Sequence, residues 1–223
     1  ARGKLSQKSN FIMNKPINLQ GDNTTGLYIE NSGDGIKNDR NTARFVIGAK
    51  DNTAIPAYVP ENSLLNAVNS KEANHNKAGG DENLAEEIVG IYLNNPAAEL
   101  HVKVPQLEIE KFAKKSIGIF SKDGEVKATD GNIELKGGED NIALYANGGK
   151  IDYTGNITVN KSTLVGDKGN TNGTGNMAVF SASPNNYVKV NGDINMDTRD
   201  TVAIYSDNTK VDLNGKLDIK LKP

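Results

Sequence analysis

The sequence contains no cysteine and no tryptophan, and only 5% of its residues are aromatic. The absence of cysteine excludes disulfide bonds, thiolate nucleophiles and cysteine-ligated zinc. The charges are nearly balanced, with 26 lysines and arginines against 28 acidic residues. That balance argues against binding to nucleic-acid phosphates or to membranes through a polybasic surface. No apolar run approaches the roughly 20 residues that a transmembrane helix requires.

Glycine and asparagine are abundant, with 23 and 30 residues in a chain of 223. Both favour turns and disfavour helices. Hydrophobic residues make up only 36% of the chain, which is lean for a globular protein of this length. The composition fits either partial disorder or many short strands joined by tight turns, and the periodicity of the sequence decides between them.

A four-residue core recurs along the chain, in the order aliphatic, glycine or alanine, aliphatic, tyrosine or phenylalanine. Successive aromatic residues of the five full copies are 28, 25, 35 and 25 residues apart, and the long gap contains an inserted loop at 165–175. A partial copy is Thr25-Gly26-Leu27-Tyr28. The full copies are Val89-Gly90-Ile91-Tyr92, Ile117-Gly118-Ile119-Phe120, Ile142-Ala143-Leu144-Tyr145, Met177-Ala178-Val179-Phe180 and Val202-Ala203-Ile204-Tyr205.

Each full copy is followed by two further strand patterns. The first is an aliphatic residue, and the second is an alternating apolar pair that a glycine precedes in four of the five copies. The aliphatic residues are Leu100, Val126, Ile151, Val188 and Val211. The glycines are Gly131, Gly155, Gly192 and Gly215. The pairs are Leu107/Ile109, Ile133/Leu135, Ile157/Val159, Ile194/Met196 and Leu217/Ile219. Such alternation between turn residues predicts three short strands in about 25 residues.

One such unit cannot bury its own apolar face, but stacked units can, because equivalent side chains then lie one above another at about 4.8 Å. We therefore predict an all-β fold, a right-handed parallel β-helix with about 25 residues per coil. An antiparallel sandwich or barrel remains the alternative. In the four-residue core we expect positions one and three to point inward. The other possibility is that the aromatics point inward and the small second residue makes room for them. We expect the aromatics to form a structural stack rather than a sugar-binding platform.

The first half of the chain is less regular. We predict irregular β coils over 1–50, an excursion over 51–87, and regular coils over 88–223. The excursion is expected to hold a short helix at Pro60–Val68 and an exposed loop at Lys71–Asn83, as either a recognition surface or a linker. The chain begins at Ala1 without a leader and ends in an alternating pattern, so we expect a fragment of a longer protein. Substitution of Asn170 in the inserted loop is expected to leave folding unchanged.

Candidate chemistry is sparse. His75 and His101 are the only histidines, and neither has a ligand-spaced partner, so we expect no metal site, no cofactor and no catalytic residue. Gly137-Gly138-Glu139-Asp140 lacks the tandem repetition of calcium-binding β-rolls. The residue that follows the second-strand aliphatic forms a charged series through the units. Its sign alternates from Lys127 onward, which predicts a surface ladder of ion pairs rather than a carboxylate cluster. The series is His101, Lys127, Asp152, Lys189 and Asp212.

Over residues 88–223 the repeats resemble the passenger domains of large autotransporters, most closely the fusobacterial-type outer-membrane adhesins. The resemblance is carried by Ser116–Ser121, Asn141–Ala146 and Thr201–Ser206. It implies a non-enzymatic adhesin or stalk segment, exported and displayed at the cell surface by a C-terminal outer-membrane β-barrel, of which we recognise no segment here. The partners it implies are host or bacterial surface proteins or glycans, with attachment that serves virulence. It implies no nucleic-acid partner, and we expect a monomer. No functional residue carries over, because the family has no shared active-site motif.

Two other classes remain open. A glycan-active β-helix enzyme, a polysaccharide lyase or hydrolase, would gather carboxylates around a groove and would cleave acidic polysaccharides. A trimeric fibre or tailspike-like protein would associate as three chains, which light scattering detects.

Overall fold

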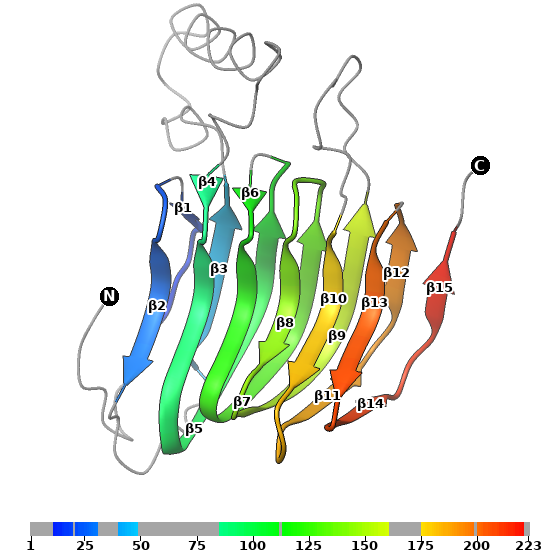
Figure 1. Cartoon of the computed structure of the whole chain (residues 1–223). Coiled ribbons are helices and arrows are strands. Elements are labelled where there is room, and N and C mark those ends of the chain that lie inside the picture. Colours follow the sequence, from blue (N-terminus) through cyan, green and yellow to red (C-terminus); the bar gives the residue numbers. More distant parts are fainter. Residues whose placement is uncertain are drawn as a thin grey trace, which may run out of the picture.

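The fold is known from a computed structural model, which describes residues 11–19, 21–30, 40–48, 85–111, 113–160, 175–198 and 200–220. Every regular element in these ranges is a β-strand (Figure 1), so the predicted all-β class is confirmed there. The strands are β1 (Ile17–Leu19), β2 (Thr25–Glu30), β3 (Thr42–Ile47), β4 (Ala85–Glu86), β5 (Val89–Ile109), β6 (Ala113–Lys114), β7 (Ile117–Leu135), β8 (Ile142–Ala146), β9 (Lys150–Asn160), β10 (Met177–Ala182), β11 (Tyr187–Asn191), β12 (Ile194–Asp197), β13 (Val202–Asp207), β14 (Lys210–Leu213) and β15 (Leu217–Ile219).

All the strand pairs in the described residues are parallel. Thirteen strands form one sheet, and β4 and β6 form a second, two-stranded sheet. Each unit pairs with the unit before it and the unit after it, so that Ile157 lies between Ile133 and Ile194. Chain-adjacent units therefore run in the same direction, and the antiparallel sandwich or barrel is wrong for this part of the chain.

The pairing divides the sheet into three ladders, because the long strands β5, β7 and β9 bend and contribute to more than one of them. Ladder A holds the four-residue core, ladder B the aliphatic residue that follows it, and ladder C the alternating apolar pair. Ladder A consists of β2, the start of β5, the start of β7, β8, β10 and β13. Ladder B consists of the middle of β5, the middle of β7, the start of β9, β11 and β14. Ladder C consists of β1, β3, the ends of β5, β7 and β9, β12 and β15.

The hydrophobic core lies between the ladders. In ladder A the third position of the core motif is buried, as Ile91 and Ile119 illustrate, and this part of the prediction is confirmed. The first position is only half-buried, so its predicted inward orientation is wrong. The second position is buried instead: a Cβ added at Gly90 would lie 2.6 Å from the carbonyl oxygen of Gly118 and 3.5 Å from Cδ1 of Leu107. The small residue is required because this position faces the core at close range.

The bend that precedes ladder A has the same backbone conformation in every repeat. The residue two places before position one has a positive φ in all six copies, although only one of the six is glycine. Left-handed conformation reverses the chain direction locally and costs most non-glycine residues about 1 kcal/mol or more. These residues are Asn23, Glu87, Lys115, Asp140, Gly175 and Asp200.

Buried polar side chains join successive repeats at this bend. Oδ1 of Asn141 accepts a hydrogen bond from the backbone N–H of Ser116 at 2.9 Å. Oδ1 of Asn176 accepts one from the backbone N–H of Asn141 at 2.8 Å. The side-chain nitrogen of Asn141 has a partner as well, since Nδ2 donates to the carbonyl oxygen of Ala113 at 3.0 Å. Each asparagine thus satisfies backbone groups that the bend leaves without partners in the sheet.

The predicted glycine column has a steric cause. A Cβ added at Gly192 would lie 2.1 Å from the carbonyl oxygen of Gly155, one repeat away, and one added at Gly215 would lie 2.0 Å from that of Gly192. We expect Gly192→Ala to lower the free energy of unfolding by about 1–3 kcal/mol, as overpacking does. Urea unfolding followed by circular dichroism measures this. The control variant is Ala182→Gly, which removes one methyl group at a half-exposed residue outside the glycine column. A Gly192→Ala protein as stable as the wild type would contradict the close stacking.

Within the irregular β coils predicted over 1–50, β2 and β3 pair in parallel with β5. The helix expected at Pro60–Val68, the loop expected at Lys71–Asn83 and Asn170 lie outside the described residues. The boundaries 1–50, 51–87 and 88–223 stay predictions.

Candidate interaction surfaces

The aromatic residues of ladder A form one continuous column, which confirms the predicted stacking. Ring centroids of neighbouring repeats are 4.5–5.1 Å apart, and near-parallel and edge-to-face contacts alternate along the whole column. The rings are half-buried and contact one another rather than the core, so their edges form part of the outer surface. The column is Tyr28, Tyr92, Phe120, Tyr145, Phe180 and Tyr205.

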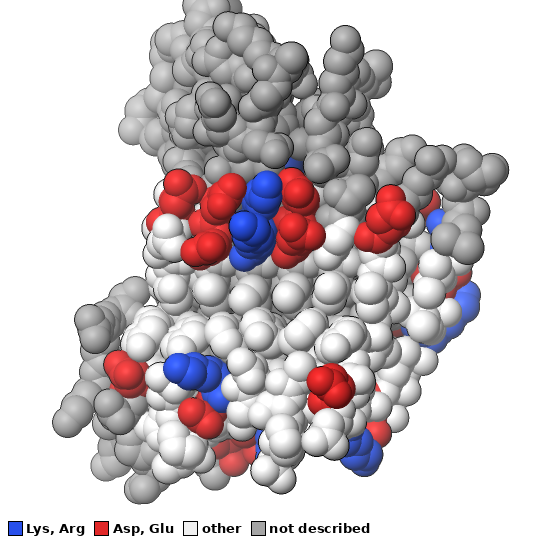
Figure 2. Space-filling view, viewed as in Figure 1, with Lys and Arg blue, Asp and Glu red and all other residues white. Residues whose placement is uncertain are grey.

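A second half-exposed column runs beside the aromatic one. It consists of the residues at position one of the core motif, and together the two columns form what we call the aromatic band. Figure 2 shows this face of the molecule as a broad uncharged strip across the strands of ladder A. The second column is Thr25, Val89, Ile117, Ile142, Met177 and Val202.

Charged residues border the aromatic band along the bend that precedes ladder A. They occupy the two places before the corner residue, which is buried in four of the six repeats, and we call them the acidic ridge. The described ridge residues hold six carboxylates and two ammonium groups, a net charge of −4, and Arg199 beside Asp200 in the sequence brings the net charge at these places to −3. Figure 2 shows the ridge as a row of red side chains with a blue centre. The ridge residues are Asp22, Glu86, Glu87, Lys114, Lys115, Glu139, Asp140 and Asp200.

The ridge is ordered by contacts between repeats. Nζ of Lys114 lies 3.3 Å from Oε2 of Glu139. Oδ1 of Asp22 accepts a hydrogen bond from the backbone N–H of Glu86 at 2.9 Å. Both lysines lie in one repeat, so the carboxylates of the other repeats outnumber the positive charges that can neutralise them.

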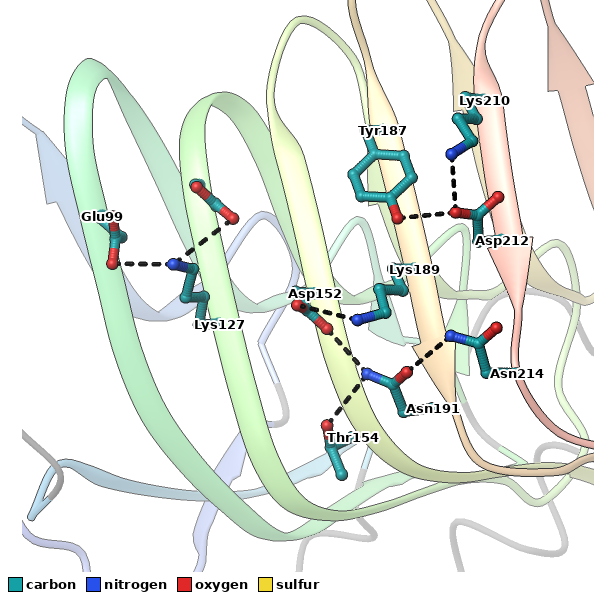
Figure 3. Close-up of polar contacts among 11 residues, drawn as sticks. Glu99, Lys127, Asp152, Thr154, Tyr187, Lys189, Asn191, Lys210, Asp212 and Asn214 are labelled. Atoms are coloured by element: carbon teal, nitrogen blue, oxygen red, sulfur yellow. Dashed lines mark hydrogen bonds and ion pairs between the residues drawn. The ribbon is translucent and has the colours of Figure 1, made fainter.

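The outer face of ladder B carries the charged series predicted from the sequence (Figure 3), and its register is confirmed. Nζ of Lys189 lies 3.8 Å from Oδ2 of Asp152 in the neighbouring repeat. Lys127 differs from the prediction, because its ammonium group hydrogen-bonds Glu99 at 3.1 Å instead of pairing with Asp152. This hydrogen bond raises the pKa of Lys127.

Uncharged polar side chains continue the network on this face. Nδ2 of Asn191 donates to Oδ1 of Asp152 at 3.0 Å, and Oδ1 of Asn191 accepts from Asn214 at 2.9 Å (Figure 3). An open groove of about 660 Å³ crosses the same face and is lined by side chains from four successive repeats, among them His101, Lys127 and Asp152. Lys103 and Asp130 of the groove pair with each other at 3.2 Å, whereas Lys127 and Asp152 pair with residues beside the groove.

Asp212 lies at the end of this network. Hydrogen bonds from Lys210 and Tyr187, at 2.9 and 2.8 Å, lower the pKa of its carboxyl group. A lowered pKa in the folded state means that the paired carboxylate stabilises the fold above its unfolded-state pKa, and this contribution is lost as the pH falls through the folded-state value.

Lys210→Met is expected to raise the pKa of Asp212 toward its ordinary value, because the first of the two donors is removed. A carboxyl chemical-shift titration by NMR measures this value directly. Lys216→Met, which removes the lysine that precedes β15 and lies 3.4 Å from Asp218, is expected to leave it unchanged. An Asp212 pKa that is the same with and without Lys210 would contradict the assigned pairing.

The other residues considered for a metal or catalytic site lie as follows. Nε2 of His101 contacts Oε1 of Glu99 at 2.5 Å, and His75 lies outside the described residues. The described ranges contain no group of three or more histidine or acidic side chains arranged to hold a metal ion. Gly137 and Gly138 adopt positive φ in the turn before ladder A, where Nδ2 of Asn176 donates to the carbonyl of Gly137. Within the described ranges there is also no helix long and apolar enough to cross a membrane.

The sequence could have revealed the acidic ridge but did not. Glu86-Glu87, Lys114-Lys115 and Glu139-Asp140 each stand at the same distance before the core motif. Aligning the repeats on the core motif brings these charged pairs into register.

No protein-family model, curated protein or solved structure matches this chain.

Proposed function

We propose that this chain is a section of a non-enzymatic adhesin displayed at a bacterial cell surface, or of the stalk of such an adhesin. In this proposal it resembles an autotransporter passenger and attaches to proteins or glycans of host or bacterial cells. The observation that carries the proposal is the aromatic column of the aromatic band, six aromatic side chains from six successive repeats in continuous contact. Aromatic residues and methionine are enriched where proteins bind one another.

The same proposal includes the finer fold, a right-handed β-solenoid with about 25 residues per coil. The parallel register of three ladders supports it, as does the strong preference of parallel strand connections for right-handed crossovers. Such a fold lengthens by adding units, which suits a protein that must hold a binding surface away from a membrane.

Cell attachment tests the proposed function. Fluorescently labelled chain is incubated with epithelial cells and with bacteria, and bound fluorescence is measured by flow cytometry. We expect saturable binding to at least one cell type that unlabelled chain displaces and that heat-unfolded chain does not reproduce. Absence of saturable binding to every cell type tested would contradict the proposal. Release of oligosaccharides from a panel of acidic polysaccharides would contradict its non-enzymatic part.

A further inference from the structure

We propose that the aromatic band and the acidic ridge together bind a basic amphipathic helix of a partner protein, which lies along the stack across the strands of ladder A. The inference rests on the proposed function and specifies which face binds and what kind of segment it takes. Three properties of the face lead to it: its apolar character, the charge beside it, and the pairing of the backbone beneath it.

The apolar character distinguishes this face from that of ladder B. On ladder B the charged groups already pair with each other, as Lys127 does with Glu99 and Lys210 with Asp212. A partner docking there would have to displace these pairs or leave charges without water, which costs free energy. The aromatic band contains no charged side chain. Its polar groups are the hydroxyls of Thr25 and of four tyrosines, so covering its half-exposed apolar surface is favourable.

The acidic ridge selects the charge of the partner. Its net negative charge lies along the side of the band immediately before position one of each repeat, and Glu30 and Asp123 add negative charge near Tyr92 of the band. A partner with lysine or arginine beside its apolar stripe would complement it, whereas an anionic membrane surface would be repelled. The ridge therefore favours a protein segment over a lipid surface.

The backbone pairing selects a helix. The interior strands of ladder A have partners on both sides, as β8 has in β7 and β10, so a partner cannot join this face by adding a strand. The partner must satisfy its own backbone groups, which a helix does. Six strands at about 4.8 Å span roughly 24 Å, the length of a helix of about 16 residues.

The test uses the whole chain and a synthetic probe. The probe is an 18-residue helical peptide with leucines on one stripe and lysines elsewhere, labelled for fluorescence anisotropy. A matched peptide carries glutamate in place of every lysine. We expect the lysine peptide to bind at least about tenfold more tightly than the glutamate peptide at low salt, and the difference to shrink in 0.5 M NaCl as charges are screened.

Charge-reversal variants test the ridge. Glu87→Lys with Asp200→Lys is expected to weaken lysine-peptide binding about five- to tenfold. Lysine fits this bend, because Lys115 occupies the equivalent position with the same left-handed conformation. The matched control is Asp130→Lys, on another face. Asp130 is an exposed acidic residue that also has a positive φ, and its Oδ2 lies 3.2 Å from Nζ of Lys103. We expect the control to change binding less than twofold. An equal loss in both variants would overturn the proposal.

Variants of the band test the apolar contribution. Ile142→Thr with Met177→Gln removes apolar surface without adding charge, and Thr25 already occupies the position of Ile142 in an earlier repeat. We expect about fivefold weaker binding with an unchanged salt dependence. Unchanged affinity would overturn the proposal.

Photo-cross-linking of the lysine peptide to the unmodified chain provides a test that needs no variant. Cross-links are expected on ladder A and the ridge, and cross-links confined to ladder B or C would also overturn the proposal. Failure of this inference is separate from failure of the proposed function. A chain that attaches to cells equally well with and without Ile142→Thr and Met177→Gln remains an adhesin but does not use this face.

Discussion

Replacing Ile133 with aspartate is expected to lower the free energy of unfolding by about 4–6 kcal/mol. The Ile133 side chain is fully buried in ladder C between the repeats that contain Leu107 and Ile157. A carboxylate at this position would lose its hydration without gaining a partner, and the apolar contact of the isoleucine would be lost as well. A loss of this size is comparable with the total stability of many domains.

Urea unfolding followed by far-ultraviolet circular dichroism measures the loss, and hydrogen exchange locates it. Exchange should accelerate first in β7 and in the strands that pair with it, since each repeat contacts only its neighbours. The matched control is Asn132→Asp, which introduces the same side chain at the preceding, exposed residue and is expected to cost less than about 0.5 kcal/mol. Equal stability of Ile133→Asp and Asn132→Asp would show that Ile133 does not face the core.

Replacing Asn141 with leucine is expected to lower the free energy of unfolding by about 3–5 kcal/mol. Leucine is similar in size but can neither accept from the N–H of Ser116 nor donate to the carbonyl of Ala113. Asn141 and Ser116 are both fully buried, so water cannot replace the lost partners without opening the bend. Each unsatisfied buried group costs about 1–3 kcal/mol.

Two variants calibrate the Asn141 result. Asn141→Ser is expected to have an intermediate effect, because Ser116 occupies the equivalent position and its Oγ accepts a hydrogen bond from the N–H of Ile88. Asn147→Leu, at an exposed residue of the next turn, is expected to cost less than about 0.5 kcal/mol. Thermal and urea unfolding measure all three. An Asn141→Leu protein no less stable than Asn147→Leu would contradict the role given to the buried asparagines.

Those features that recur in residue type were predictable from the sequence. The four-residue core, the alternating pairs and the glycine column each repeat the same kind of residue in every unit. Each corresponds to one ladder or to one close contact between repeats. The charged series on ladder B was predictable for the same reason, because neighbouring strands in parallel register bring equivalent residues together.

Features that recur in conformation but not in residue type were not predictable. The left-handed residue before ladder A is asparagine, glutamate, lysine, aspartate or glycine, so no composition marks it. The inward-facing second position was misjudged because strict alternation assigns positions one and three to the same face, whereas the burial pattern places positions two and three inward. The partner of Lys127 was predicted wrongly. Its register partner is Asp152, but its ammonium group pairs with Glu99, two residues before the aligned His101 of the preceding repeat.

Successive repeats are translated along one axis in parallel register. Pulsed electron paramagnetic resonance tests this arrangement most directly, with spin labels at Asn18 and, in separate samples, at Thr158, Asn195 or Asp218. These residues share one outward column of ladder C, and the absence of native cysteine confines labelling to the introduced sites. Parallel stacking predicts mean separations of roughly 19, 24 and 29 Å, increasing by one strand spacing per repeat. Separations that fail to increase in this order would contradict the account.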